Sequence, residues 1–301
     1  MIILKELAIR TTTAIFFVLI IVSGISFNPW TFFTLFLIII IGTLNEYYTI
    51  IRLARSIPQK TMGIVTGILL FAVSFFNAIG IVDGKFFAIV IPFIFLIFIF
   101  EIFANNRYPI NNIAYTILGI IYIALPFSLA NYLILKSGNV HLVTANSNTN
   151  NIIDQFGVIT NFSYNKINFH PNILLGIFFL TWINDTGAYL TGVTIGKNRL
   201  FPRVSPKKSW EGSIGGLIFT IIGAYIISRY FIELSPTNWF VVAFITVIFA
   251  TLGDLTESWF KRSLKIKDSG RILPGHGGLL DRFDAIIMVI PFVFTYFKLF
   301  L

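Results

Sequence analysis

Residues 238–301 read NWFVVAFITVIFATLGDLTESWFKRSLKIKDSGRILPGHGGLLDRFDAIIMVIPFVFTYFKLFL, with a charged stretch between two long apolar segments. The charged stretch, residues 258–284, holds six Lys or Arg residues, three Asp, one His and four Gly. Each flanking segment approaches the roughly 20 apolar residues that an α-helix needs to cross a bilayer. The pattern predicts two transmembrane helices joined by a polar segment at the membrane surface.

The whole chain has the composition of a membrane protein. Of its 301 residues, 56% are hydrophobic and only 12% are charged, whereas soluble chains carry about a quarter charged residues. The net charge of +9 is typical of Lys and Arg retained at an inner membrane face beside anionic lipids, so we expect no nucleic-acid partner. The chain has no cysteine, which excludes disulfides and thiolate metal sites.

Apolar segments of sufficient length recur along the sequence and predict an all-α, polytopic bundle of about nine transmembrane helices. Lys5 and Arg10 precede the first apolar run as in a signal peptide, but no small-residue cleavage site follows, so we interpret this run as the first transmembrane helix. The predicted helices span about residues 11–27, 30–50, 61–81, 84–102, 111–135, 172–192, 212–232, 238–258 and 283–301.

The distribution of basic residues predicts the orientation of this bundle. With a cytoplasmic N-terminus, 17 of the 22 Lys and Arg residues fall on the inner side, as the positive-inside rule expects, and the C-terminus lies outside. We divide the chain into N-terminal helices (1–135), an Asn-rich outer loop (136–171) and a C-terminal catalytic region (172–301). The C-terminal region contains two basic inner loops, at 193–211 and 259–282.

Several carboxylates lie within or next to the predicted helices. On a helix, Asp254, Glu257 and Lys261 share one face together with Ser258. Acids inside a transmembrane segment are costly and usually functional, although pairing of Lys261 with Asp254 or Glu257 would also explain them. Asp281 and Asp284 share a face at the start of the last helix, where one could instead cap the helix. Asp185 is another intramembrane carboxylate.

Glycines and basic residues near these acids favour an anionic, phosphate-bearing ligand. Gly277 and Gly278 beside His276 would let backbone N–H groups approach phosphate oxygens, while His276 could equally cap a turn. Lys207 and Lys208 precede a helix that begins with glycines, which is a plausible phosphate cradle or an ordinary basic loop. Mg²⁺, which favours carboxylate and phosphate oxygens, suits Asp254 and Asp281. For Glu46 and Glu101, at inner helix ends, we expect an interfacial position without a catalytic role.

Residues 258–284 resemble the signature of the bacterial phosphatidate cytidylyltransferases, or CDP-diacylglycerol synthases. The matching positions are Ser258, Phe260, Lys261, Arg262, Lys267, Asp268, Gly270, Leu273, Pro274, His276, Gly277, Gly278, Leu279, Asp281, Arg282, Phe283 and Asp284. The resemblance extends to Asp185, to residues 205–212 and to Asp254, and so covers about residues 172–284. Val193 departs from the pattern, since the family often has a basic residue there.

The resemblance implies a homodimeric, multi-pass enzyme of the bacterial plasma (inner) membrane that makes CDP-diacylglycerol and pyrophosphate from CTP and phosphatidic acid. It implies that Asp254 and Asp281 hold the metal, with Mg²⁺ as the expected ion and K⁺ as a companion. We expect catalytic roles for Asp254, Lys261, His276 and Asp281, and substrate binding by Ser205, Lys207, Lys208, Arg262, Lys267, Gly277, Gly278 and Arg282. Secondary candidates are Asp185, Glu257, Asp268 and Asp284.

Two other functions are compared with this interpretation. A CTP-dependent lipid-alcohol kinase would use a related membrane site but release CDP instead of pyrophosphate. An ion-coupled transporter would account for intramembrane Asp185 and Asp254, but it predicts polar breaks in two matched halves. Here the polar residues gather in the C-terminal third, which disfavours transport.

Overall fold

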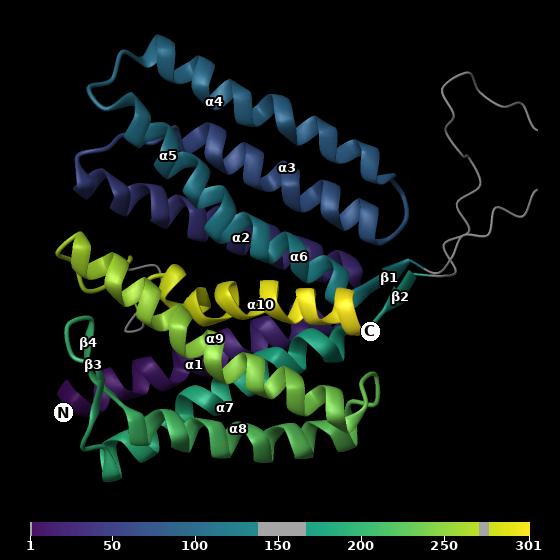
Figure 1. The fold of residues 1–301 in the computed structure, drawn as a ribbon, viewed down its shortest axis with the longest axis vertical. Coiled ribbons are helices and arrows are strands. Elements are labelled where there is room, and N and C mark those ends of the chain that lie inside the picture. The colour runs from purple at the N-terminus through teal and green to yellow at the C-terminus, as the bar shows by residue number, and fades with distance from the viewer. Residues whose placement is uncertain (1, 138–166, 271–276) are drawn as a thin grey trace, which may run out of the picture.

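The computed structural model describes residues 2–137, 167–270 and 277–301, and in these ranges it confirms a bundle of nine helices (Figure 1). Helices α5 and α6 form one of the nine, because a π-helical turn, Ile120–Ala124, joins them. The helices are α1 (Ile2–Ser26), α2 (Pro29–Ile51), α3 (Lys60–Ala78), α4 (Val90–Ala104), α5 (Pro109–Gly119), α6 (Leu125–Ile134), α7 (Pro171–Ile195), α8 (Trp210–Tyr230), α9 (Pro236–Ser263) and α10 (Leu280–Phe300).

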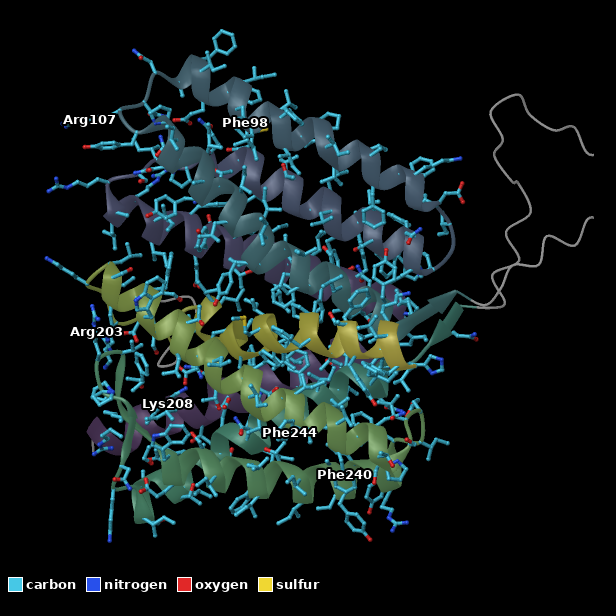
Figure 2. All side chains as sticks on the ribbon, viewed as in Figure 1. Phe98, Arg107, Arg203, Lys208, Phe240 and Phe244 are labelled. Atoms are coloured by element: carbon cyan, nitrogen blue, oxygen red, sulfur yellow. The ribbon has the colours of Figure 1, made fainter. Side chains whose placement is uncertain are left out.

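Eight of these helical segments are long and apolar enough to cross a membrane. The apolar part of α1, Thr11–Ser26, is shorter. Aromatic side chains such as Phe98, Phe240 and Phe244 point away from the bundle (Figure 2), and Phe244 is 57% exposed. An outward apolar surface on helices that satisfy their own backbone hydrogen bonds is what a bilayer requires, so the chain is a multi-pass membrane protein.

The helices form two groups with α10 between them (Figure 1). Helices α2 to α6 lie on one side, and α1 with α7, α8 and α9 lie on the other. Helix α10 contacts both groups through α6, α2, α7 and α9. The N-terminus lies at the same end of the bundle as the β3–β4 hairpin, and the C-terminus lies at the opposite end.

Two short antiparallel ribbons replace parts of the predicted loops. Strands β1 (Leu135–Ser137) and β2 (Ile167–Phe169) pair at the two ends of the Asn-rich segment, whose residues 138–166 lie outside the described structure. Strands β3 (Arg199–Phe201) and β4 (Ser205–Ser209) form a hairpin within the predicted basic loop 193–211. The second basic loop is shorter than predicted, because α9 continues to Ser263 and α10 begins at Leu280.

The side chains of Glu46 and Glu101, for which the sequence predicted an interfacial position, are buried within the protein, at 4% and 2% exposure. Glu101 accepts hydrogen bonds from the side chains of Gln59, Asn106 and Asn112, at 2.5, 3.0 and 2.7 Å. A buried carboxylate is tolerated when such donors replace water. Glu101 therefore holds the ends of α3, α4 and α5 together.

Candidate active site

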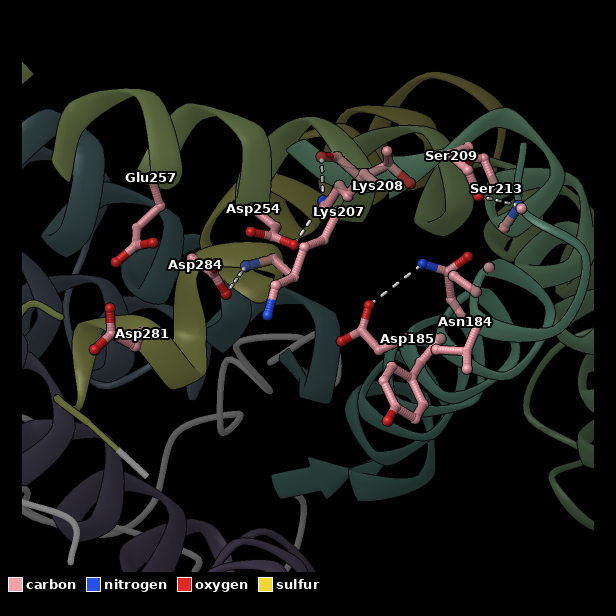
Figure 3. A pocket seen from close by; sticks show the side chains of 18 of the residues that line it. Asn184, Asp185, Lys207, Lys208, Ser209, Ser213, Asp254, Glu257, Asp281 and Asp284 are labelled. Carbon is pink, nitrogen blue, oxygen red and sulfur yellow. Dashed lines mark hydrogen bonds and ion pairs between the residues drawn. The ribbon is translucent and has the colours of Figure 1, made fainter. Parts of the chain in front are cut away.

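A cavity of about 730 Å³ lies among α7, the β3–β4 hairpin, α8, α9 and α10 (Figure 3). It collects carboxylates and cations that are separated by up to a hundred residues in the sequence. The lining carboxylates are Asp185, Asp254, Glu257, Asp268, Asp281 and Asp284. The lining cations are Arg199, Lys207, Lys208, Lys261 and Arg282.

Helix α7 reaches the cavity because glycines let it pack closely on α8. A Cβ at Gly215 would lie 2.1 Å from Thr191 Oγ1, and a Cβ at Gly216 would lie 2.7 Å from Asn184 Oδ1. These α8 glycines therefore serve helix packing, which is a simpler explanation than the predicted phosphate cradle. Buried Asn184 then donates from Nδ2 to Asp185 Oδ1 at 3.4 Å and orients that carboxylate toward the cavity.

The β3–β4 hairpin brings the two adjacent lysines to the site. Glu211 fixes the start of the hairpin by accepting from the backbone and side-chain amides of Asn198, at 3.1 and 2.7 Å. Ser209 caps α8 by accepting from the Gly212 N–H at 3.1 Å. Lys207 and Lys208 both line the cavity, and Lys208 Nζ lies 2.5 Å from Asp254 Oδ2.

Helix α9 presents Asp254, Glu257 and Lys261 to the cavity, which confirms the predicted shared face. Of the two pairings left open for Lys261, the structure has the one with Glu257, while Asp254 pairs with Lys208. Ser258 Oγ also donates to Asp254 Oδ1 at 3.2 Å. Glu257 is only 2% exposed, and its second oxygen, Oε1, is buried and has no hydrogen-bond partner among the residues that the structure describes.

Helix α10 contributes Asp281 at the centre of a hydrogen-bond network. Lys261 Nζ lies 2.8 Å from Asp281 Oδ1, and the backbone N–H groups of Ser269 and Gly278 donate to Oδ2 at 3.1 and 2.8 Å. The N-cap position of α10 is Leu279, which has no side-chain cap. Asp281 therefore connects α9, α10 and the segment between them. This role is larger than the helix cap that the sequence also allowed for Asp281.

The glycines of the signature have a structural role that differs from the predicted one. Neither Gly277 nor Gly278 lines the cavity, and the Gly278 N–H is already bonded to Asp281. Gly277 adopts φ +82°, and a Cβ at Gly278 would lie 2.1 Å from Ser269 Oγ and 2.6 Å from Glu46 Oε2. The glycines therefore provide space and a turn, and the phosphate contacts at these positions stay a prediction.

Glu46 on α2 is a site-supporting residue that the sequence did not reveal. Its Oε2 accepts from the Leu280 backbone N–H at 2.9 Å and from Ser269 Oγ at 3.4 Å. This contact joins residues 234 positions apart and anchors the start of α10. The only available signal was a single acid in an apolar helix, which sequence reasoning assigned to the interface.

Other predicted residues fall outside the cavity. Ser205, Arg262 and Lys267 do not line it, and Arg262 instead donates to the Ile266 carbonyl at 3.4 Å. His276 lies outside the described residues. Arg199 and Val193 do line it, although Arg199 was not among the predicted site residues. The apolar side chain of Val193 gives the cavity no basic group there.

A second cavity, of about 220 Å³, lies on the α1 side of the same acidic residues. It shares Asp185, Asp281, Arg282 and Asp284 with the larger cavity. Its other walls are largely apolar and come from α1, α7 and α10, with Ala14, Phe17, Val18, Trp182 and Ile286 among them. One row of charged residues is thus bordered by a polar cavity on one side and by an apolar cavity on the other.

The fold and this charged site define a polytopic α-helical membrane protein with a cavity near one end of its bundle. The model of a family described as the Cytidylyltransferase family matches residues 8–300. The chain therefore belongs to the Cytidylyltransferase family.

Curated relatives match part of the chain with higher identity. A phosphatidate cytidylyltransferase of Haemophilus influenzae is 45% identical over 133 residues, or 42% of this chain and 46% of that protein. Proteins of the same name from Staphylococcus haemolyticus and Staphylococcus aureus are 49% and 48% identical over 120 residues, 39% of this chain and 46% of theirs. The chain thus spans about half the length of the curated relatives it matches.

Proposed function

We propose that this protein is a phosphatidate cytidylyltransferase, which converts CTP and phosphatidic acid to CDP-diacylglycerol and pyrophosphate. The observation that carries the proposal is the row formed by Asp185, Asp281, Arg282 and Asp284, which borders both cavities. Transfer from a polar nucleotide to a lipid phosphate requires charged residues that both substrates can reach. Family membership and the names of the relatives support the same reaction.

The reaction joins two polyanions. A phosphate oxygen of phosphatidic acid attacks the α-phosphorus of CTP, and the bond from that phosphorus to the bridging oxygen of the β-phosphate breaks to release pyrophosphate. The attacking oxygen is already anionic at neutral pH, so the reaction does not need a strong general base. Catalysis then depends on positioning and on neutralising charge, as in phosphoryl transfer generally.

The lining cations supply part of that neutralisation. Lys207, Lys208 and Arg199 lie on the hairpin side of the larger cavity, where they would contact the CTP phosphates. Arg282 borders both cavities and would meet the lipid phosphate. Arg and Lys suit these roles because charge-assisted hydrogen bonds to phosphate are strong and, for Arg, bidentate.

The donor set fits Mg²⁺ bound together with the nucleotide. Within the described residues no three acidic or His side chains come close enough to form a metal cage. Mg²⁺ usually takes one or two carboxylates and completes its shell with phosphate oxygens and water, and Asp254 and Asp281 would supply the carboxylates. When bound, Mg²⁺ supplies Lewis-acid charge stabilisation to the phosphates. Lys208 and Lys261 hold these carboxylates in place.

The apolar cavity suits the acyl portion of phosphatidic acid. Phe17, Val18 and Trp182 would contact hydrocarbon, while Arg282 at its border would hold the phosphate. A lipid substrate placed in this way never leaves the membrane. This explains why the charged residues lie at the ends of membrane-spanning helices.

The experiment is to incubate the purified protein with CTP and Mg²⁺ and to identify the products with phosphatidic acid or diacylglycerol as acceptor. Pyrophosphate released only with phosphatidic acid supports the proposal. CDP released with diacylglycerol identifies the lipid-alcohol kinase instead, and solute flux without CTP turnover identifies a transporter. Measuring CTP turnover at several K⁺ concentrations and a fixed Mg²⁺ concentration tests whether K⁺ is a companion ion.

The proposal includes a location and an assembly. The protein would be a homodimer in the bacterial plasma (inner) membrane, with its N-terminus and charged site facing the cytoplasm, where CTP is made. The excess of basic residues at the N-terminal end of the bundle, including Arg107, Arg203 and Lys208 (Figure 2), supports this orientation. Labelling of single introduced cysteines from either side of the membrane tests the orientation. Measurement of the mass of the protein in detergent tests the homodimer.

A further inference from the structure

A separate basic cavity of about 260 Å³ lies between the α2–α3 and α4–α5 connections. Arg55 and Ile57 line it from the first connection, and Asn106, Arg107, Tyr108 and Asn112 line it from the second and from α5. It shares no lining residue with the candidate active site. It belongs to the N-terminal half of the chain.

The cavity is held open by a buried scaffold. Asn112, which is 1% exposed, accepts from the Ile57 backbone N–H at 2.6 Å and donates to Glu101 at 2.7 Å. Asn106 also donates to Glu101, at 3.0 Å. Both loops are therefore fixed to the same buried groups, and the cavity does not need a ligand to form.

The two arginines that face this cavity have no carboxylate partner within the described part of the chain. Glu101 is the nearest acid in the scaffold, but amide donors occupy it and it does not line the cavity. Arg55 adopts the left-handed conformation, with φ 60°. That conformation normally favours Gly at a helix end, and it is uncommon for a residue with a long side chain.

We propose that this cavity binds the anionic phosphate headgroup of a membrane phospholipid. Two arginines that line one preformed hollow suit a phosphate, because a guanidinium donates bidentate hydrogen bonds to phosphate oxygens. The adjoining side chains favour a lipid over free phosphate, because Ile57, Tyr108 and Ile110 are 54%, 39% and 79% exposed beside the arginines. Basic pockets between transmembrane helices at the cytoplasmic face are suited to lipid headgroups.

The test measures lipid retained by the purified full chain in detergent, using native mass spectrometry. Phosphatidylglycerol is compared with phosphatidylcholine of the same acyl chains. The test variant combines Arg55→Gln with Arg107→Gln. The control combines Arg52→Gln with Arg203→Gln, which removes the same charge from exposed arginines that line none of the three cavities.

We expect phosphatidylglycerol to bind the test variant at least about tenfold more weakly than the wild type, since two charge-assisted contacts are lost. The control should bind as the wild type does, and phosphatidylcholine should not distinguish the three proteins. Equal losses in test variant and control would reduce the effect to net charge and overturn the proposal. Displacement of the lipid by millimolar inorganic phosphate would overturn the lipid assignment.

A single Arg107→Gln variant covers the case in which the double variant does not fold. Arg107 lies in an exposed loop, its guanidinium lies 5.4 Å from the centre of the Tyr108 ring, and it does not belong to the scaffold of Asn106, Asn112 and Glu101, so its loss should not disturb that scaffold. We expect a several-fold loss of phosphatidylglycerol binding. Binding equal to that of the wild type would count against the proposal.

Discussion

Lys208 and Asp254 meet inside the larger cavity, with Nζ of the lysine 2.5 Å from Oδ2 of the aspartate. The contact joins the β3–β4 hairpin to α9, and the side chains remain 24% and 43% exposed. Ion pairs with this much solvent contact contribute little to stability. The pair therefore matters mainly for the charge that it presents to a ligand.

Replacement of Lys208 tests this role. We expect Lys208→Gln to lower CTP turnover by about 100-fold, because a positioned charge facing the phosphates is lost, and to leave the thermal unfolding midpoint nearly unchanged. Steady-state pyrophosphate release and thermal unfolding in detergent measure the two effects. Arg203→Gln, on the same hairpin but outside the cavity, should retain full activity. Equal loss in both variants would contradict the assignment.

Asp254 and Asp281 should respond differently to the same substitution. Both Asn variants should lose turnover by about 100-fold or more, because each removes a proposed metal ligand. Only Asp281→Asn should also destabilise the protein, by about 2 kcal/mol, since it weakens bonds to Lys261, Ser269 and Gly278. Thermal unfolding of the two variants side by side provides the measurement. Near-normal turnover in both would remove the metal-site assignment.

Gly278 should not tolerate a methyl group. A Cβ there would lie 2.1 Å from Ser269 Oγ and 2.7 Å from the Gly270 nitrogen, so Gly278→Ala should cost about 1–3 kcal/mol of stability. Gly84→Ala is the matched control, because a Cβ at Gly84 meets nothing within 4 Å. We expect a lower unfolding midpoint for the first variant alone. An unchanged midpoint for Gly278→Ala would show that the segment adapts.

Metal binding should depend on the nucleotide. Because no three acidic or His side chains of the described residues form a metal cage, we expect weak Mg²⁺ binding alone and tighter binding with a non-hydrolysable CTP analogue. Calorimetric titration with and without the analogue measures the difference. Chelation should abolish turnover, and added Mg²⁺ should restore it. Tight Mg²⁺ binding without nucleotide would disagree with the proposed site.

The sequence predicted those features that follow local rules. The nine helices follow from apolar segment length, and the shared face of Asp254, Glu257 and Lys261 follows from helical spacing. The convergence of Asp281 with these residues followed from the adjoining helix ends. Short-range periodicity and spacing contain enough information for these predictions.

The features that the sequence could not predict depend on distant contacts. Gly278 lies against Asp281, Ser269 and Glu46, and Glu46 is on α2. Thr191 and Asn184 of α7 occupy the space beside the α8 glycines. No local pattern specifies which helix packs against a glycine. The burial of Glu46 was missed for the same reason.

The bond from Leu280 N–H to Glu46 also constrains how the family's genes can recombine. A chimera that takes α1 to α6 from one member and the C-terminal half from another breaks the support of α10 unless its α2 supplies an acceptor at this position. The two halves are therefore not interchangeable modules. Exchange of the N-terminal halves should succeed only when this acidic residue is transferred with them.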